Sequence, residues 1–214
     1  MSASIPPPYP PSATVLASVR AAMLVEAKRP QTSWKTRALQ LIGASLGLSA
    51  VIGLGAVISG NAALTTIALR WVTLLGLAAV GPLLVWASVV PGRTASRWVA
   101  MAASVAVAVV MVVLRPAATL NASSAPEWLC TALHLAVAGP AIFTALTLLR
   151  SMAPSTPRSI AAGLAAGTTG ALLGEMMCER DAAHVASFHL AAWTLAALLV
   201  VVLGARVKRR SWAA

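Results

Sequence analysis

The chain contains two cysteines and three histidines, and all five lie in its carboxy-terminal half. Cys130 and His134 are four residues apart, so they share one face if this stretch is helical. Cys178, His184 and His189 follow further along the chain, close to one another in sequence. Thiolates and imidazoles are the side chains that bind zinc, and a cysteine pair can also be oxidised to a disulfide outside the cytoplasm.

Three interpretations of these residues stay open at this point. In the first, two cysteines and two histidines form a four-ligand site, for which zinc is the candidate cofactor. In the second, the cysteine pair senses oxidants. In the third, the five side chains only pack against their neighbours. The spacing lacks the paired Cys-x-x-Cys motifs of a structural zinc site.

Arg70 and Glu175 are charged residues inside long apolar stretches. A charge at the centre of a bilayer costs roughly 2.5–3.5 kcal/mol on insertion scales, so such residues are paired or functional. Two alternatives stay open for these charges. In one, Glu175 pairs with Arg70 or with a histidine and the pair only holds the helices together. In the other, the charges take part in sensing or transport.

The elements that position these residues are predicted to be membrane-spanning helices. The chain has 214 residues, of which 59% are hydrophobic and 10% are charged. A soluble domain carries about 25% charged residues, and a bilayer-spanning helix needs about 20 apolar residues in a row. A transmembrane barrel would need alternating polar and apolar strands instead. We therefore predict an all-α integral membrane protein, a bundle of six helices joined by short loops.

Hydropathy divides the chain into a tail, a membrane domain and a short basic end. The cytoplasmic tail is expected at 1–37, the membrane domain at 38–205 and the basic tail at 206–214. The six spans are predicted at about 38–59, 64–90, 98–114, 128–149, 160–178 and 185–205.

The positive charges predict how these spans are oriented. Thirteen of the sixteen basic residues fall on one side of the predicted membrane. They are Arg20, Lys28, Arg29, Lys35, Arg37, Arg93, Arg97, Arg150, Arg158, Arg206, Lys208, Arg209 and Arg210. Arg70, Arg115 and Arg180 fall on or near the other side. Basic loops stay in the cytoplasm, so both termini are predicted to lie on the cytoplasmic side of a bacterial inner membrane. The cysteines and histidines are then predicted to lie on its outer side. Because the charges are scattered over short loops, direct DNA binding is not expected.

The amino-terminal tail is predicted to contain a proline-rich stretch and a short helix. Prolines within residues 1–11 oppose helix formation, whereas Ser12 can cap a helix that ends before Pro30. Four apolar residues share one face of this helix: Val15, Leu16, Val19 and Met23. A helix of this length is marginal in water, so the face is expected to bind a protein or to rest on the inner leaflet.

No catalytic motif is present, so a non-enzymatic role is predicted. Two alternatives from other classes remain. One is a small transporter or metal-handling protein in which Glu175, His134 and His189 line a pathway. The other is a membrane thiol oxidoreductase that uses Cys130 and Cys178.

Residues 127–205 carry a recognisable pattern. A cysteine near the start of the fourth span is followed by the glycine-rich stretch 163–174, and then by Cys178-Glu179-Arg180-Asp181 and Trp193. This pattern resembles the membrane anti-sigma factors of the negative-regulator-of-sigma-F type. Family members commonly have Cys-Pro-Glu at the second cysteine, whereas this chain lacks that proline, and its histidines are a variant feature.

The resemblance implies a regulator whose short cytoplasmic segment holds an extracytoplasmic-function sigma factor at the membrane. It also implies that the paired cysteines perceive the signal. Within the family the chain most resembles light-response regulators of carotenoid synthesis, so the expected signal is an envelope, light or oxidative stimulus. Release of the sigma factor would follow a change of the helix bundle or cleavage by a membrane protease.

Overall fold

The computed structural model describes residues 12–28, 33–60, 64–115, 126–152 and 155–211, and these residues form helices without strands. The chain divides into two compact units, Met1–Ser33 and Trp34–Ala214. The described part of the first unit is a single helix, α1 (Ala13–Lys28). The proline-rich stretch 1–11 lies outside the described residues.

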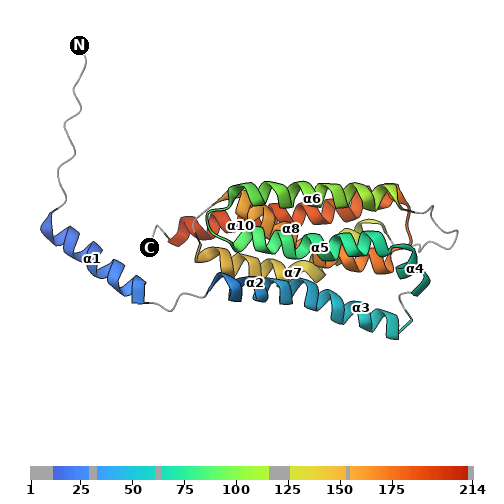
Figure 1. Ribbon diagram of the computed structural model, residues 1–214, viewed down its shortest axis with the longest axis horizontal. Helices are drawn as coiled ribbons and strands as arrows, with labels where there is room; N and C mark the ends of the chain where they lie inside the picture. The colour runs from blue at the N-terminus through green and yellow to red at the C-terminus, as the bar shows by residue number, and fades with distance from the viewer. Residues whose placement is uncertain (1–11, 29–32, 61–63, 116–125, 153–154, 212–214) are drawn as a thin grey trace, which may run out of the picture. The chain divides into compact units, whose positions relative to one another are not determined.

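The second unit is a bundle of long antiparallel helices (Figure 1). Its elements are α2 (Trp34–Ile42), the π-helix η1 (Gly43–Gly47), α3 (Leu48–Ile58), α4 (Leu64–Leu69), α5 (Trp71–Val89), α6 (Thr94–Val113), α7 (Trp128–Arg150), α8 (Thr156–Met177), α9 (Ala182–His184), the π-helix η2 (Val185–His189) and α10 (Leu190–Ser211). Six helices among the described residues are long and apolar enough to cross a membrane. The prediction of an all-α membrane protein with six such helices is confirmed.

The six candidate spans differ in detail from the apolar stretches of the sequence. The first, Trp34–Ile58, runs continuously through α2, η1 and α3. The predicted second span, 64–90, is divided at Arg70, whose φ of −112° and ψ of 17° depart from helical values. The break separates α4 from α5 and puts Arg70 at the start of α5.

Helix α8 is the central element of the bundle and packs against α5, α7 and α10. Its buried residues are mostly Ala and Gly, which allow neighbouring backbones to approach closely. Such close packing matters in a lipid bilayer, because the hydrophobic effect does not drive helices together there. A Cβ added at Gly163 would lie 2.5 Å from Cα of Ala197. Trp193 of α10 donates from Nε1 to the carbonyl of Leu164 at 2.7 Å. The glycines of α8 therefore allow α8 and α10 to pack backbone against backbone.

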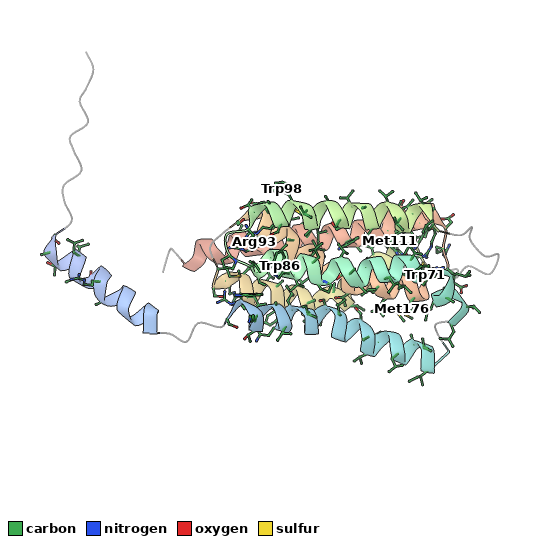
Figure 2. The ribbon with its side chains drawn as sticks, in the orientation of Figure 1. Trp71, Trp86, Arg93, Trp98, Met111 and Met176 are labelled. Carbon is green, nitrogen blue, oxygen red and sulfur yellow. The ribbon has the colours of Figure 1, made fainter. Side chains whose placement is uncertain are left out.

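The bundle has two chemically different ends. The "basic end" holds the α5–α6 and α7–α8 connections, with Arg93, Arg97, Arg150 and Arg158. The "cysteine end" holds α4, the end of α6, the start of α7 and the α8–α9 connection. Figure 2 labels Arg93 and Trp98 near the basic end, and Trp71 and Met176 near the cysteine end. Trp71 and Trp98 are exposed, as expected for tryptophans at the two interfaces of a membrane.

Candidate functional site

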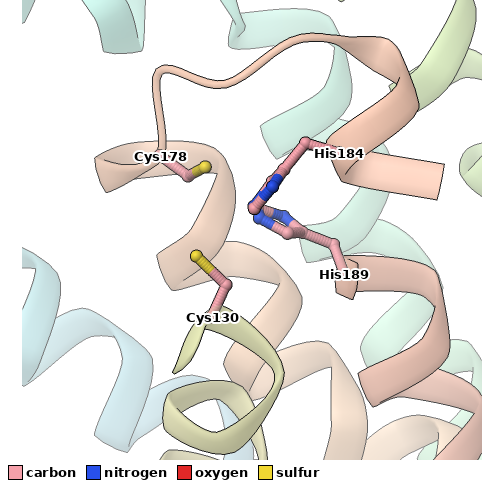
Figure 3. A group of neighbouring side chains, drawn as sticks. All are labelled: Cys130, Cys178, His184 and His189. Atoms are coloured by element: carbon pink, nitrogen blue, oxygen red, sulfur yellow. The ribbon is translucent and has the colours of Figure 1, made fainter. Parts of the chain in front are cut away.

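Four side chains meet at the cysteine end of the bundle. Cys130 comes from the first turn of α7, Cys178 follows α8, and His184 and His189 lie in α9 and η2 (Figure 3). One ligand atom from each of the four lies within 4.8 Å of the others. Both histidines are buried, both cysteines are half-buried, and the thiols are free. We call these four residues the Cys₂His₂ cluster.

The π-helical turn explains why His184 and His189 meet. In a regular α-helix, residues five positions apart point about 140° away from each other, because each residue turns the chain by about 100°. Here Leu190 donates its backbone N–H to the carbonyl of Val185, the i→i+5 bond that widens the turn. The two rings lie 5.3 Å apart between centroids. The wider turn thus brings both imidazoles to one side.

His134 lies beside the cluster but outside it. Its Nδ1 donates to the carbonyl of Cys130 at 2.5 Å, the i→i−4 partner within α7. Its ring is 4.4 Å from that of His189, between centroids. Of the five predicted sensing or ligand candidates, the structure brings four together as a set and gives His134 a neighbouring, backbone-bound position.

The packing alternative paired Glu175 with Arg70 or a histidine, but the structure gives Glu175 a different partner. The carboxylate of Glu175 forms an ion pair with Arg115 at 2.9 Å, and Thr73 donates to its other oxygen at 3.1 Å. Arg70 instead donates from Nη1 to two main-chain carbonyls, that of Glu175 at 2.8 Å and that of Cys178 at 2.5 Å. The break before α5 gives Arg70 this position, because the chain leaves the helical course there.

Arg115 is the important residue that sequence reasoning did not single out. It follows α6 directly, and it donates to the carbonyls of Cys178 and Arg180 as well as pairing with Glu175. Arg70 and Arg115 therefore both donate hydrogen bonds to the carbonyl of Cys178. The usable signal was a count of charges, since only three basic residues were assigned to this end and Glu175 needed a partner there.

Two acidic residues position His184. Asp181 caps α9, and its Oδ1 accepts from the backbone N–H of His184 at 2.9 Å. Glu127 lies 3.9 Å from Nδ1 of His184 and 3.8 Å from Nη1 of Arg180. Asp181 thus acts on the main chain of His184 and not on its ring.

Two glycines of α8 make room for the histidines. A Cβ added at Gly170 would lie 2.7 Å from the carbonyl oxygen of His134. A Cβ added at Gly174 would collide with Nε2 of His134 and lie 2.8 Å from Nδ1 of His189. Real Cβ atoms do not make such contacts, so the imidazoles can occupy these positions only beside glycine.

The predicted partner-binding face lies on α1. Ser12 caps the helix, its Oγ accepting from the backbone N–H of Val15 at 3.4 Å. Val15 and Leu16 are exposed, at 49% and 55% of their surface. The side chains of Val19 and Met23 lie outside the described part of the structure.

The fold and the site together define a class: a polytopic helical membrane protein with a thiol–imidazole cluster at one end and a separate amino-terminal helix. The chain belongs to the family described as negative regulator of sigma F, which matches residues 13–210. It is therefore a negative regulator of a sigma factor, and the family resemblance recognised in the sequence is confirmed.

One characterised relative is the carotenogenesis protein CarR of Myxococcus xanthus. It is 33% identical over 199 residues, which are 93% of this chain and 89% of that protein. No solved structure matches the chain.

Proposed function

We propose that this protein is a membrane-anchored anti-sigma factor that binds an extracytoplasmic-function sigma factor through α1 and releases it when the cysteine end of the bundle changes. The single observation that carries the proposal is the extent of the family match. It begins at residue 13, the first residue of α1, and continues through all six candidate spans. The amino-terminal helix is thus as much a part of the family pattern as the bundle.

The surface of α1 supports a binding role. Val15 and Leu16 leave about half of their surface open. Val19 is four residues after Val15 in the sequence, the spacing of one helix face. A helix of sixteen residues is marginal in water when it stands alone. Docking its apolar face into a groove of a partner would stabilise both. The partner of matching chemistry is the sigma factor that the family regulates.

The distribution of charge supports an orientation with α1 in the cytoplasm. The basic end carries Lys35, Arg93, Arg97, Arg150 and Arg158. Positively charged segments stay on the cytoplasmic side of the inner membrane. Helix α10 also ends at the basic end. The Cys₂His₂ cluster then faces the periplasm, where a signal can reach it without entering the cytoplasm.

The cluster is the proposed receiver of the signal. Thiols and imidazoles react with oxidants, including those produced by light, and thiols bind metal ions. The similarity to a carotenogenesis protein favours a light or oxidative stimulus and carotenoid synthesis genes as the regulated targets. Release proceeds by repacking of the helices or by a membrane protease that cleaves the altered chain.

Co-purification tests the binding role of α1. The full chain is expressed with a candidate extracytoplasmic-function sigma factor, for which a gene next to that of this protein is the first choice. The chain is then captured in detergent. Val15→Asp together with Val19→Asp places charge on the apolar face, and we expect the sigma factor to be lost from the captured complex.

The matched control is Ala17→Asp together with Ala21→Asp. Both alanines are exposed and lie on the opposite face of α1, so the control carries the same added charge. Its loss of helix propensity is larger, because Ala favours a helix more than Val does, so the control is the more stringent of the two. We expect it to retain the sigma factor. Equal retention by both double variants would exclude the apolar face of α1 as the binding surface.

A further inference from the structure

We propose that Cys130, Cys178, His184 and His189 form a tetrahedral binding site for one zinc ion, which joins the start of α7 and the end of α8 to the first turns of the last span. The inference is independent of sigma-factor binding, because it concerns the isolated chain. It selects four ligands from the five candidates and assigns His134 to a supporting position.

The unpaired nitrogens of the buried histidines are the first argument. Within the part of the chain that the structure describes, neither ring nitrogen of His184 or His189 has a hydrogen-bond partner. His184 and His189 are only 4% and 1% exposed. A buried polar group without a partner costs about 1–3 kcal/mol, so four such atoms in two neighbouring rings need an explanation. A metal ion bound by one nitrogen of each ring removes that cost for two of them.

The separations between the ligand atoms are the second argument. Zinc lies about 2.3 Å from sulfur and 2.0–2.1 Å from nitrogen, so ligand atoms in a tetrahedral site are about 3.3–3.8 Å apart. The four candidate atoms already lie within 4.8 Å of one another (Figure 3). Closing around the ion needs a contraction of about 1 Å, which small rotations of the side chains supply.

Charge balance is the third argument. When zinc binds, the two S–H bonds break, the protons pass to water, and two S–Zn bonds form. The two thiolates then offset the two positive charges of the ion, and the two imidazoles remain neutral. A neutral centre suits this partly buried position, where an uncompensated charge would be costly.

The donor set selects the class of metal. Magnesium and calcium prefer oxygen ligands, whereas thiolate with imidazole suits zinc.

The hydrogen bonds around the site also favour a rigid arrangement. Asp181 caps the turn that carries His184, and Arg70 and Arg115 both hold the carbonyl of Cys178. Such supporting contacts reduce the reorganisation that binding requires.

The test uses the full chain, reduced and purified in detergent. It is treated with a chelator, reloaded with zinc, dialysed, and analysed for metal content by mass spectrometry. We expect one zinc ion per wild-type chain. Cys130→Ser, Cys178→Ser, His184→Asn and His189→Asn are each expected to lose stoichiometric zinc, while circular dichroism monitors the helical fold.

The matched control is His134→Asn. It removes an imidazole from the same zone, while the asparagine amide can still donate to the carbonyl of Cys130. We expect this variant to keep its zinc. Zinc retained by the double variant Cys130→Ser, Cys178→Ser, or lost from a folded His134→Asn chain as fully as from His189→Asn, would overturn the assigned ligand set.

Cobalt substitution in the wild-type chain gives a readout that does not depend on whether a variant folds. A tetrahedral site with two thiolates predicts strong d–d absorption in the visible range and a sulfur-to-cobalt charge-transfer band in the near ultraviolet. A wild-type chain that binds neither metal stoichiometrically, or binds cobalt without the thiolate band, refutes the site.

Discussion

Arg115 and Glu175 form an ion pair of 2.9 Å in which both side chains are only 1% exposed. The pair joins the end of α6 to the last turns of α8, and Arg115 also holds the carbonyl of Cys178. The charged groups at this end are therefore arranged around the segment that carries a cysteine of the Cys₂His₂ cluster. A change at Cys178 would act directly on the bonds that keep α6 against α8.

Removing the charge of Glu175 alone is expected to be strongly destabilising. Glu175→Gln leaves Arg115 buried without its counter-charge, and breaking a buried pair in this way costs about 3–5 kcal/mol. The free energy of unfolding can be measured in mixed micelles with increasing denaturing detergent.

The double variant Glu175→Gln, Arg115→Gln tests whether the two charges are coupled. It removes both charges together, so we expect its loss of stability to be smaller than the sum of the two single losses. Strictly additive losses would mean that the ion pair does not link α6 to α8.

Gly174→Ala is expected to disturb the site through a steric clash. The added methyl group would collide with the ring of His134 and crowd Nδ1 of His189. Overpacking of this kind costs about 1–3 kcal/mol, and displacement of His189 should also weaken zinc binding. Thermal unfolding and zinc titration measure the two effects.

Gly139→Ala in α7 is the matched control for this substitution. No heavy atom lies within 4 Å of the position its Cβ would take, so we expect it to be neutral or to stabilise the protein by about 0.4–1 kcal/mol. If both substitutions had the same effect, the close packing of Gly174 against the histidines would be contradicted.

Much of the fold could be predicted because the bilayer imposes a simple rule on composition. Apolar stretches of the required length revealed six candidate helices, because the length and composition of each stretch can be read without knowing what it packs against. The break at Arg70 was not predicted, because Leu64–Leu69 and Trp71–Val89 are both apolar and hydropathy does not report the backbone angles between them. Its cause is tertiary: the guanidinium of Arg70 reaches the carbonyls at the end of α8.

The sequence predicted that the two cysteines and three histidines lie at one end of the bundle, but not which of them form a set or how they are arranged there. Topology alone brought the cysteines and histidines to one end, since they lie at neighbouring ends of helices. Topology could not show that a π-helical turn aligns His184 with His189. That turn depends on a single i→i+5 backbone hydrogen bond, which hydropathy does not reveal. The partner of Glu175 was misjudged for a related reason: Arg115 lies after α6, and only the packed bundle brings it to α8.

Side-specific labelling tests most directly the claim that the membrane separates the cluster from α1. In a chain carrying Cys130→Ser and Cys178→Ser, single cysteines are introduced by Glu179→Cys at the cysteine end and by Ser18→Cys on α1, both exposed positions. A membrane-impermeant maleimide is added to spheroplasts before and after lysis. We predict that Glu179→Cys is labelled in intact spheroplasts and that Ser18→Cys is labelled only after lysis. Labelling of both positions from the same side would contradict the account.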